Sequence, residues 1–279
     1  MKQRIIVVGN GMVGHQFIDK ILASESAIDY EIITFSEEPR LAYDRVKLSS
    51  YFDGASAEDL ALTTEADYRE KGVVFTLNDR VTAIDTEQQT VTTANGTTES
   101  YDKLVLATGS YPFVPPIPGG DQEHCLVYRT IEDLEAIESS AQSSQVGAVI
   151  GGGLLGLEAA NALKNAGLKT HVLEFSNGLM ARQLDETGGQ LLSEKIEELG
   201  VKVHTGKNTK EIVAGEECRY RMNFADGSHL ETDMLIFSAG IRPRDELAKA
   251  AGLAMGERGG IAVNNYCQTS ADNIYAIGE

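Results

Sequence analysis

The fold of this chain is decided by two segments, Ile5-Ile6-Val7-Val8-Gly9-Asn10-Gly11-Met12-Val13-Gly14 and Val146-Gly147-Ala148-Val149-Ile150-Gly151-Gly152-Gly153-Leu154-Leu155-Gly156. Each is an apolar run of strand length, followed by the pattern G-x-G-x-x-G and then by apolar residues at helical spacing. The first glycine makes the tight turn after the strand, and the second lets the backbone approach a pyrophosphate. The third packs helix against strand, so that the N–H groups at the helix start point at the anion. The two segments therefore predict two dinucleotide-binding sites.

An acidic residue follows each pattern, near the end of the next strand-like run. In the second half this residue is Glu174. A carboxylate there accepts hydrogen bonds from a ribose 2′-OH and repels a 2′-phosphate, and no basic residue follows until Arg182, so NADH is favoured over NADPH. In the first half either Glu37 or Glu38 occupies the equivalent place, and we prefer Glu37. The alternative, that these acids are solvated residues at strand ends, stays open.

The rest of the sequence alternates strand-like and helix-like runs, which predicts an α/β fold with mainly parallel sheets. In the first half we expect strands at 4–9, 30–35 and 103–109, helices at 12–24, 41–51 and 63–72, and an antiparallel group at 73–77, 80–85 and 90–93. In the second half we expect a helix from the pattern to about 166, a strand at 169–175, a helix near 185–199, an antiparallel group over 201–233 and a strand at 234–240. The last strand, 274–279, should return to the first domain.

A cluster of prolines gives the clearest domain boundary, since Pro112, Pro115, Pro116 and Pro118 form a stiff extended connector. The length of 279 residues is enough for two domains with cores of their own. We therefore predict two Rossmann-like, three-layer dinucleotide-binding domains, the second inserted into the first. The first domain comprises residues 1–114 and 241–279, and the second comprises residues 115–240.

Composition excludes several classes of function. A net charge of −18 argues against partners made of nucleic acid and against anionic membrane surfaces, which require an excess of Lys and Arg. No apolar run reaches the roughly 20 residues of a membrane span, so a cytoplasmic protein is expected. The three cysteines are isolated, and the five histidines are scattered without a ligand motif. No metal site is expected.

The chain resembles, over its whole length, the two-dinucleotide flavoprotein reductases of the pyridine nucleotide-disulfide oxidoreductase superfamily. The motifs that carry the resemblance are the two glycine patterns, Ala107-Thr108-Gly109, Ala239-Gly240-Ile241-Arg242-Pro243 and Ile274–Glu279. The resemblance implies that FAD binds to the first half, through Gly9, Gly11, Met12, Val13, Gly14, Glu37, Glu38, Arg45, Lys47, Ala107, Thr108, Gly109 and Glu279. It implies that NADH binds to the second half, through Gly151, Gly153, Leu154, Leu155, Gly156, Glu174, Ala239 and Gly240, with Glu158 as a further cofactor-binding residue.

Within that superfamily, the chain is most similar to the flavin module of the large subunits of NADH-dependent assimilatory nitrite reductases. Residues 8–15, residues 42–50 and the terminal Gly278-Glu279 carry this similarity, although most superfamily members end the last strand with Gly-Asp. The resemblance implies that electrons pass from NADH through flavin to an iron–sulfur or sirohaem acceptor, which reduces nitrite to ammonium. Two alternatives stay open, a free-standing NADH:rubredoxin or ferredoxin reductase and a non-catalytic dinucleotide-binding fragment.

Full-length relatives continue beyond the last motif into a dimerisation domain, an iron–sulfur region and a sirohaem domain, so a full-length protein could form a homodimer. We expect that this chain lacks the C-terminal part of the family fold, binds FAD weakly and is inactive by itself as a nitrite reductase. Tight stoichiometric FAD in the purified chain would contradict this expectation.

Two charged residues are candidates for a catalytic pair. Many ferredoxin-reductase-like relatives have a lysine at the position that matches Ser50, and it pairs with a glutamate that matches Glu158. Lys47 lies three residues before Ser50 on the same predicted helix, so its side chain should emerge on nearly the same face. The hypothesis is that Lys47 pairs with Glu158 and stabilises negative charge on reduced flavin. The alternative is a solvated lysine on the surface.

Overall fold

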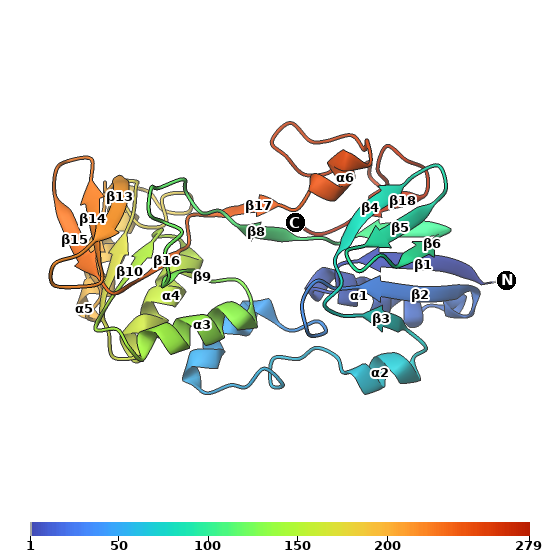
Figure 1. Cartoon of the computed structure of the whole chain (residues 1–279), viewed down its shortest axis with the longest axis horizontal. Coiled ribbons are helices and arrows are strands. Elements are labelled where there is room, and N and C mark those ends of the chain that lie inside the picture. The colour runs from blue at the N-terminus through green and yellow to red at the C-terminus, as the bar shows by residue number, and fades with distance from the viewer. Residues whose placement is uncertain (1) are drawn as a thin grey trace. The chain divides into compact units, whose positions relative to one another are not determined.

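The computed structural model describes residues 2–279, apart from the side chain of Ser26, and consists of two compact units (Figure 1). The first contains the chain up to Arg45 together with Ala57–Tyr111 and Arg242–Glu279, and the second contains Val46–Ser56 and Pro112–Ile241. The sequence assigned residues 46–56 to the first domain. The structure groups them with the second unit, where the ring of Phe52 stacks on Tyr128 with centroids 6.3 Å apart.

The first unit is built on a five-stranded parallel sheet with the order β18-β7-β1-β2-β3. Its strands are β1 (Gln3–Val8), β2 (Tyr30–Phe35), β3 (Val74–Thr76), β7 (Lys103–Leu106) and β18 (Ile274–Ala276). The prediction that the last strand returns to this sheet is confirmed, since β18 pairs with β7. The assignment of 73–77 to an antiparallel group is wrong, because β3 pairs in parallel with β2.

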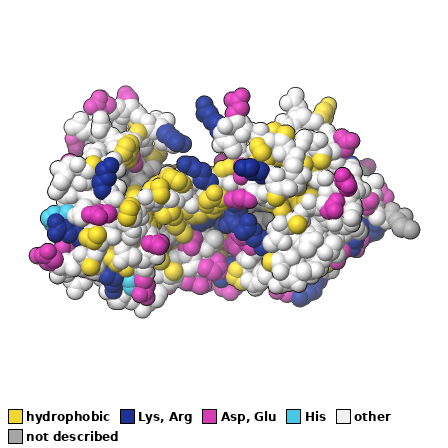
Figure 2. Space-filling view, turned by 45° about the horizontal axis from the view of Figure 1, so that its top comes forward, with side chains coloured by type: hydrophobic (Ala, Val, Ile, Leu, Met, Phe, Trp, Pro, Cys, Tyr) yellow, Lys and Arg dark blue, Asp and Glu magenta, His cyan; other side chains and the backbone are white. Residues whose placement is uncertain are grey.

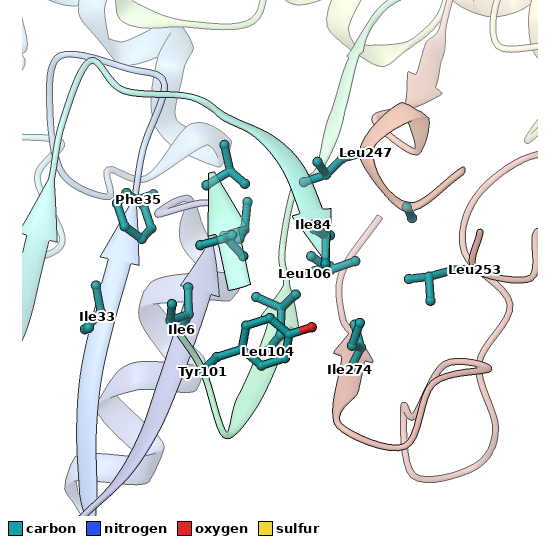
Figure 3. Close-up of a cluster of buried hydrophobic side chains, with 14 residues drawn as sticks. Ile6, Ile33, Phe35, Ile84, Tyr101, Leu104, Leu106, Leu247, Leu253 and Ile274 are labelled. Atoms are coloured by element: carbon teal, nitrogen blue, oxygen red, sulfur yellow. The ribbon is translucent and has the colours of Figure 1, made fainter. Parts of the chain in front are cut away.

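Alternating side chains of the sheet form two cores, one on each face. On one face, Ile6 and Leu104 pack with Ile84 and Leu247 (Figure 3). These partners come from the antiparallel sheet of β4 (Val81–Asp85), β5 (Thr90–Thr93) and β6 (Thr98–Ser100), and from α6 (Glu246–Ala250). On the other face, Ile5 and Val7 pack with residues that include Ile18 of α1 (Met12–Leu22) and Tyr68 of α2 (Glu65–Glu70). Between α1 and β2 lies η1 (Glu25–Asp29). The first unit therefore has the predicted three layers.

The helix predicted over 41–51 is wrong. The segment 45–53 forms a 3₁₀ helix, η2 (Arg45–Asp53), whose only buried residue is Leu48. The preceding residues Leu41, Ala42 and Tyr43 are buried but lie outside a helix. The backbone groups of Ala42 form hydrogen bonds with other segments instead of with a helical turn. The N–H of Ala42 donates to the side-chain carbonyl of Asn10 at 2.9 Å, and the carbonyl of Ala42 accepts from Leu62 N at 2.9 Å.

The second unit repeats the architecture of the first, with a parallel sheet of the order β12-β11-β10-β16-β9. Its strands are β9 (Cys125–Val127), β10 (Val146–Ile150), β11 (Lys169–Leu173), β12 (Lys202–His204) and β16 (Met234–Phe237). Its helices are α3 (Ile131–Ala141), α4 (Leu154–Asn165) and α5 (Glu186–Glu198). The prediction of an antiparallel group over 201–233 is wrong for residues 202–204, because β12 pairs in parallel with β11.

The remainder of that group is antiparallel, as predicted, and consists of β13 (Thr209–Ala214), β14 (Tyr220–Phe224) and β15 (His229–Thr232). Its residues Ile212 and Met222 form a core with Leu173 and Phe237 of the parallel sheet. Exposed apolar side chains also occur on this unit, among them Leu154, Leu155 and Phe175, and Figure 2 shows several such side chains gathered on its visible face.

The chain passes between the units on either side of residues 46–56. The longer segment 112–241 begins and ends at two short strands that pair with each other, β8 (Ser110–Pro112) and β17 (Ile241–Pro243). Hydrogen bonds flank this pair, from Phe113 N to Gly240 O at 2.8 Å and from Arg244 N to Gly109 O at 2.9 Å. Among the described residues, no helix is long and apolar enough to span a membrane.

Candidate dinucleotide-binding sites

The glycine pattern of the first unit forms a tight turn between β1 and α1. Gly9 has φ +105° and donates its N–H to Phe35 O at 2.9 Å. A β-carbon on Gly9 would lie 2.2 Å from the carbonyl oxygen of Ala107, and one on Gly14 would lie 2.1 Å from the carbonyl oxygen of Gly9. In contrast, a β-carbon on Gly11 would have no neighbour within 4 Å. The first and third glycines are thus required by close packing, whereas the second borders open space.

The second unit reproduces this geometry. Gly151 has φ +123° and donates to Leu173 O at 2.8 Å. A β-carbon on Gly151 would lie 2.2 Å from Ser238 O, one on Gly156 would lie 2.0 Å from Gly151 O, and one on Gly153 would have no neighbour within 4 Å. Helices α1 and α4 begin directly after Gly11 and Gly153, and neither N-cap is satisfied by a side chain within the described chain. Their first N–H groups are therefore positioned to bind an anion.

Both turns lie where the strand order of the sheet changes direction, at the carboxyl ends of the strands. In the first unit β1 is followed along the chain by β2 on one side and lies against β7 on the other, and in the second unit β10 lies likewise between β11 and β16. Such a switch point is the usual position of ligands in open α/β sheets. The structure therefore brings each glycine turn together with the motif that ends the neighbouring strand.

The predicted residues of the first site converge on this edge. Ala107 packs on Gly9, and Thr108 donates its hydroxyl to Arg244 O at 2.8 Å. Gly109 has φ +70° and lies close to the carbonyl oxygen of Glu279, which would be 3.7 Å from a β-carbon on Gly109. Gly278 lies against Val13, whose side chain would be 3.3 Å from a β-carbon at that glycine. Met12 and Val13 form the first turn of α1.

The two acids after β2 are both paired with arginines. Glu37 forms an ion pair with Arg244 and lies 3.9 Å from Arg80. Glu38 pairs with Arg45 and accepts a hydrogen bond from the Tyr43 hydroxyl at 2.7 Å. The predicted residue Arg45 is thus placed beside Glu38. Arg80 and Arg244 were not among the candidates, because they are distant in sequence and no motif of the first half includes them.

A buried polar network supports the first turn, and the sequence did not predict it. The side-chain amide of Asn10 donates to the hydroxyl of Tyr68 at 3.0 Å, and Nδ1 of His15 lies 2.9 Å from the same hydroxyl. Burial raises the pKa of Tyr68 and lowers the pKa of His15. The network ties the turn to α2 and, through the N–H of Ala42, to the segment before η2.

Glu174 is held by backbone N–H groups beside the second turn. Its Oε2 accepts from Gly152 N and its Oε1 accepts from Ser176 N, both at 2.7 Å. The carboxylate therefore lies at the carboxyl end of β11, directly next to the glycine pattern. On the other side of the turn, Ala239 and Gly240 follow β16, and Ser238 makes the close contact with Gly151.

Glu158 lies on α4 and lines a groove of about 340 Å³ within the second unit. Ser49, Phe52 and Asp53 of η2 line the same groove, together with Leu154, Leu157, Ala160, Asn161, Ala162, Lys164, Asn165, Ile196, Leu199 and Val201. Burial raises the pKa of the Glu158 carboxyl. Lys47 is exposed in η2, a geometry in which the helical spacing used to predict its direction does not apply.

Tyr128 is buried next to this groove and was not predicted as a functional residue. The residue is only 5% exposed, and its ring stacks on Phe52. Burial, followed by the charge of Glu158, raises the pKa of its phenol far above the ordinary value of 10.0. Its hydroxyl has no hydrogen-bond partner in the described part of the chain. No sequence motif marks such a residue, since burial and stacking follow only from the fold.

Comparison with known proteins supports the two-site reading. The profile of the family described as pyridine nucleotide-disulphide oxidoreductase matches residues 3–279. The chain is 56% identical to the nitrite reductase (NADH) large subunit of Escherichia coli, over 100% of this chain and 33% of that protein. It is 42% identical to the assimilatory nitrate reductase electron transfer subunit of Bacillus subtilis, over 100% of this chain and 36% of that protein. The chain thus spans about a third of the length of these relatives.

Solved structures give the same result for the fold. An NAD-dependent persulfide reductase from A. fulgidus superimposes with a TM-score of 0.92 at 30% identity, covering 99% of this chain and 52% of that one. The putidaredoxin reductase of a covalent complex with putidaredoxin superimposes with a TM-score of 0.90 at 29% identity, covering 99% of this chain and 67% of that one.

Proposed function

This chain belongs to the pyridine nucleotide-disulphide oxidoreductase family, and from that premise we propose that it is the FAD- and NADH-binding module of a nitrite reductase. The predicted superfamily, the α/β fold class and the assignment to the NAD(P)H-dependent oxidoreductases are confirmed by the family match and by the relatives. These findings also support FAD and NADH as the cofactors. The acceptor, the substrate nitrite and the product ammonium belong to the proposal.

The observation that carries the proposal is the duplicated turn. In both units the second glycine borders open space, while the first and third are closely packed. A β-carbon at Gly11 or Gly153 would fill the place where a pyrophosphate approaches the backbone. The residues present therefore fit two dinucleotides.

The partners of the acids differ between the two units, and this difference supports a different cofactor for each unit. Glu174 is held by backbone N–H groups, so its negative charge is available to a ribose and unfavourable for a 2′-phosphate. We therefore assign NADH to the domain of residues 115–240, which lies within the second unit. Glu37 and Glu38 are paired with arginines, so their negative charge is balanced and positive charge lies at this strand end, which favours a second anionic dinucleotide there. FAD is assigned to the domain of residues 1–114 and 241–279, which contains the first unit.

When both cofactors are bound, they supply the redox chemistry, in which a hydride passes from the nicotinamide to the flavin. The chain binds and orients them. In the proposal, Glu37 or Glu38 receives the ribose of FAD, Arg45 contacts its phosphate or ribitol, and Glu279 reaches the ribitol. Glu158 and Lys47 form a charged pair next to the flavin. The desolvation that raises the pKa of Glu158 is consistent with a place in a partly enclosed site.

The partner that accepts the electrons is proposed to be an iron–sulfur or sirohaem domain, or a small redox protein. The electron transfer subunit of Bacillus subtilis and the putidaredoxin reductase complex, both similar to this chain, support an acceptor of this class. The second of these also favours the alternative of a free-standing reductase of a small iron–sulfur protein. A homodimer of the full-length protein and a cytoplasmic location are part of the same proposal.

The proposal is tested by anaerobic titration of the FAD-reconstituted chain with NADH, followed by the visible absorbance of the flavin. We expect NADH to bleach the flavin bands of wild type. The variant Gly153→Ala should retain the FAD bands but need a much higher NADH concentration for bleaching, and the matched variant Gly11→Ala should lose FAD. Bleaching of Gly153→Ala at the rate of wild type, or the absence of flavin bands in wild type, would contradict the proposal.

The choice of acceptor needs a second assay. The rate of electron delivery from the flavin-loaded chain should be measured with two acceptors and compared. One acceptor is a ferredoxin-type iron–sulfur protein, and the other is the isolated iron–sulfur and sirohaem part of a nitrite reductase. Faster delivery to the latter supports the nitrite reductase module. Efficient delivery to the ferredoxin alone supports the free-standing reductase.

A further inference from the structure

Gly152, the residue between the first two glycines of the second turn, lies at the centre of a small cluster. Its N–H donates to Oε2 of Glu174 at 2.7 Å, while Ser176 N donates to Oε1 at 2.7 Å. Each carboxylate oxygen accepts one backbone bond here and keeps capacity for a further donor. The two N–H groups therefore fix the carboxylate in place and leave it able to accept from the two hydroxyls of a ribose.

A side chain at Gly152 would require its neighbours to shift. A β-carbon there would lie 2.5 Å from Cδ2 of Leu179, 3.0 Å from Cβ of Glu174 and 3.0 Å from Oε2 of Glu174. Leu179 is fully buried, with 0% of its surface exposed, so it cannot move into solvent. Gly152 is not among the glycines with positive φ, so backbone strain does not require a glycine here. The requirement comes from the neighbours alone.

Gly152 also holds the segment that follows Glu174. Its carbonyl accepts from Met180 N at 2.9 Å, and the side chain of Leu179 packs against its Cα position. A shift of Leu179 would therefore move the segment 175–180, which carries Ser176 and its bond to Glu174. Carboxylate and segment are thus positioned by one residue.

The first unit shows that the turn itself tolerates a side chain at this position. There the corresponding residue is Asn10, which is buried and bonded to Tyr68 and Ala42. The acids after β2 pair with arginines instead of lying against the turn. Glycine at position 152 is therefore a property of the second site and not of the fold.

We propose that Gly152 is a positioning residue that determines the preference of the second site for NADH over NADPH, through its contacts with Glu174 and Leu179. This inference rests on the proposed function, because it concerns how the assigned nucleotide is recognised. A methyl group at position 152 would push the carboxylate and Leu179 apart. The ribose would lose a charge-assisted hydrogen bond, and a 2′-phosphate would meet less repulsion.

The test measures the dissociation constants of NADH and NADPH for Gly152→Ala by titration of the flavin-loaded protein, with a thermal melt to check folding. The NADH constant should rise about tenfold, as expected for the loss of a charge-assisted bond, while the NADPH constant rises less. The matched control is the neighbouring variant Gly153→Ala. It intrudes on the pyrophosphate, so it should weaken both nucleotides by the same factor and leave their ratio unchanged.

A second variant keeps the test informative if Gly152→Ala does not fold. The double variant Gly152→Ala, Leu179→Val removes the Leu179 Cδ2 atom and retains the contacts with Glu174. It should fold and still show the narrowed ratio. An unchanged ratio in the folded variants would overturn the inference, provided that wild type prefers NADH and Glu174→Ala removes that preference. If wild type itself shows no preference for NADH, the proposed function fails instead.

Discussion

Nδ1 of His171 lies 2.9 Å from Nε2 of His204, and the two imidazole rings stack with centroids 5.2 Å apart. The rings come from the neighbouring parallel strands β11 and β12. Burial, together with the smaller effects of His204, Lys169 and Lys202, lowers the pKa of His171 from 6.5 to about 4. Burial and the nearby Lys207 and Lys202 also lower the pKa of His204, against an opposing effect of Glu197.

This pair predicts a loss of stability in mild acid. Between the ordinary pKa of 6.5 and about 4, unfolded His171 takes up a proton that the folded chain does not. The unfolded state binds more protons in this window, so stability is complete above it and falls as the pH falls through it. Urea denaturation near neutral pH and at about pH 5 measures this effect. The free energy of unfolding should differ less between the two pH values for His171→Leu than for wild type. The control is His229→Leu, which changes an exposed histidine and should behave as wild type. If the free energy of unfolding falls equally between the two pH values in all three proteins, the prediction is wrong.

A second prediction concerns the crowded glycine of the first turn. Gly9→Ala combines φ +105° with a contact of 2.2 Å to Ala107 O, so it should lower the free energy of unfolding by roughly 3 kcal/mol or more. Chemical denaturation without FAD measures this. Gly11→Ala, with no neighbour within 4 Å, should unfold like wild type in the same experiment. Similar losses in both variants would mean that the turn is not packed as described.

Tyr128 gives a prediction of the opposite sign. Its hydroxyl is buried without a partner in the described structure, so Tyr128→Phe should leave stability unchanged or raise it by up to about 1 kcal/mol. The control is Tyr220→Phe, which removes a hydrogen bond to Glu123 O and should destabilise by about 1 kcal/mol. Urea denaturation compares the two. A clear loss of stability in Tyr128→Phe would indicate that the hydroxyl has a partner.

Glu174 should carry the selection of the nucleotide. Glu174→Ala is expected to weaken NADH binding and to narrow the advantage over NADPH by about 1–3 kcal/mol, because a charge-assisted hydrogen bond is lost. Isothermal titration with both nucleotides measures this ratio. If the ratio does not change, the ribose contact lies elsewhere, for example at the exposed Asn177.

The proposed pair of Lys47 and Glu158 is tested by the rate of flavin reduction. Lys47→Met should slow the bleaching of bound FAD by NADH and make the flavin harder to reduce, if Lys47 stabilises negative charge on it. Lys195→Met changes an exposed lysine of α5 and serves as the control. If the rate and the potential of Lys47→Met both equal those of wild type, Lys47 is a surface residue.

Local patterns predicted the parts of the fold that depend on neighbours in sequence. The glycine turns, the helices after them and Glu174 beside the second turn follow from spacing alone, because each glycine is required within its own motif. Strand direction does not follow from spacing. Segments 74–76 and 202–204 have the composition of strands, but only the sheet decides that they pair in parallel.

Side chains that meet across long separations were missed for a similar reason. Asn10 and Tyr68 are 58 residues apart in sequence, and the amide of one and the phenol of the other give no sign of pairing. The pairing of Arg244 with Glu37 likewise arises only when β17 returns the chain to the first unit. The orientation of Lys47 was predicted from an α-helix, whereas η2 is a 3₁₀ helix with different spacing.

The pairing of β8 with β17 has a consequence for how such a chain can evolve. The strand that leaves the first unit and the strand that re-enters it are bonded side by side, so the entry and exit of residues 112–241 are adjacent. Recombination here can exchange residues 112–241 without separating the neighbouring ends of the first unit, since closing a loop between adjacent ends costs little entropy, while residues 46–56 of the second unit stay with the chain around them. A first unit that binds one dinucleotide can in this way be joined to different versions of residues 112–241, which select different nucleotides.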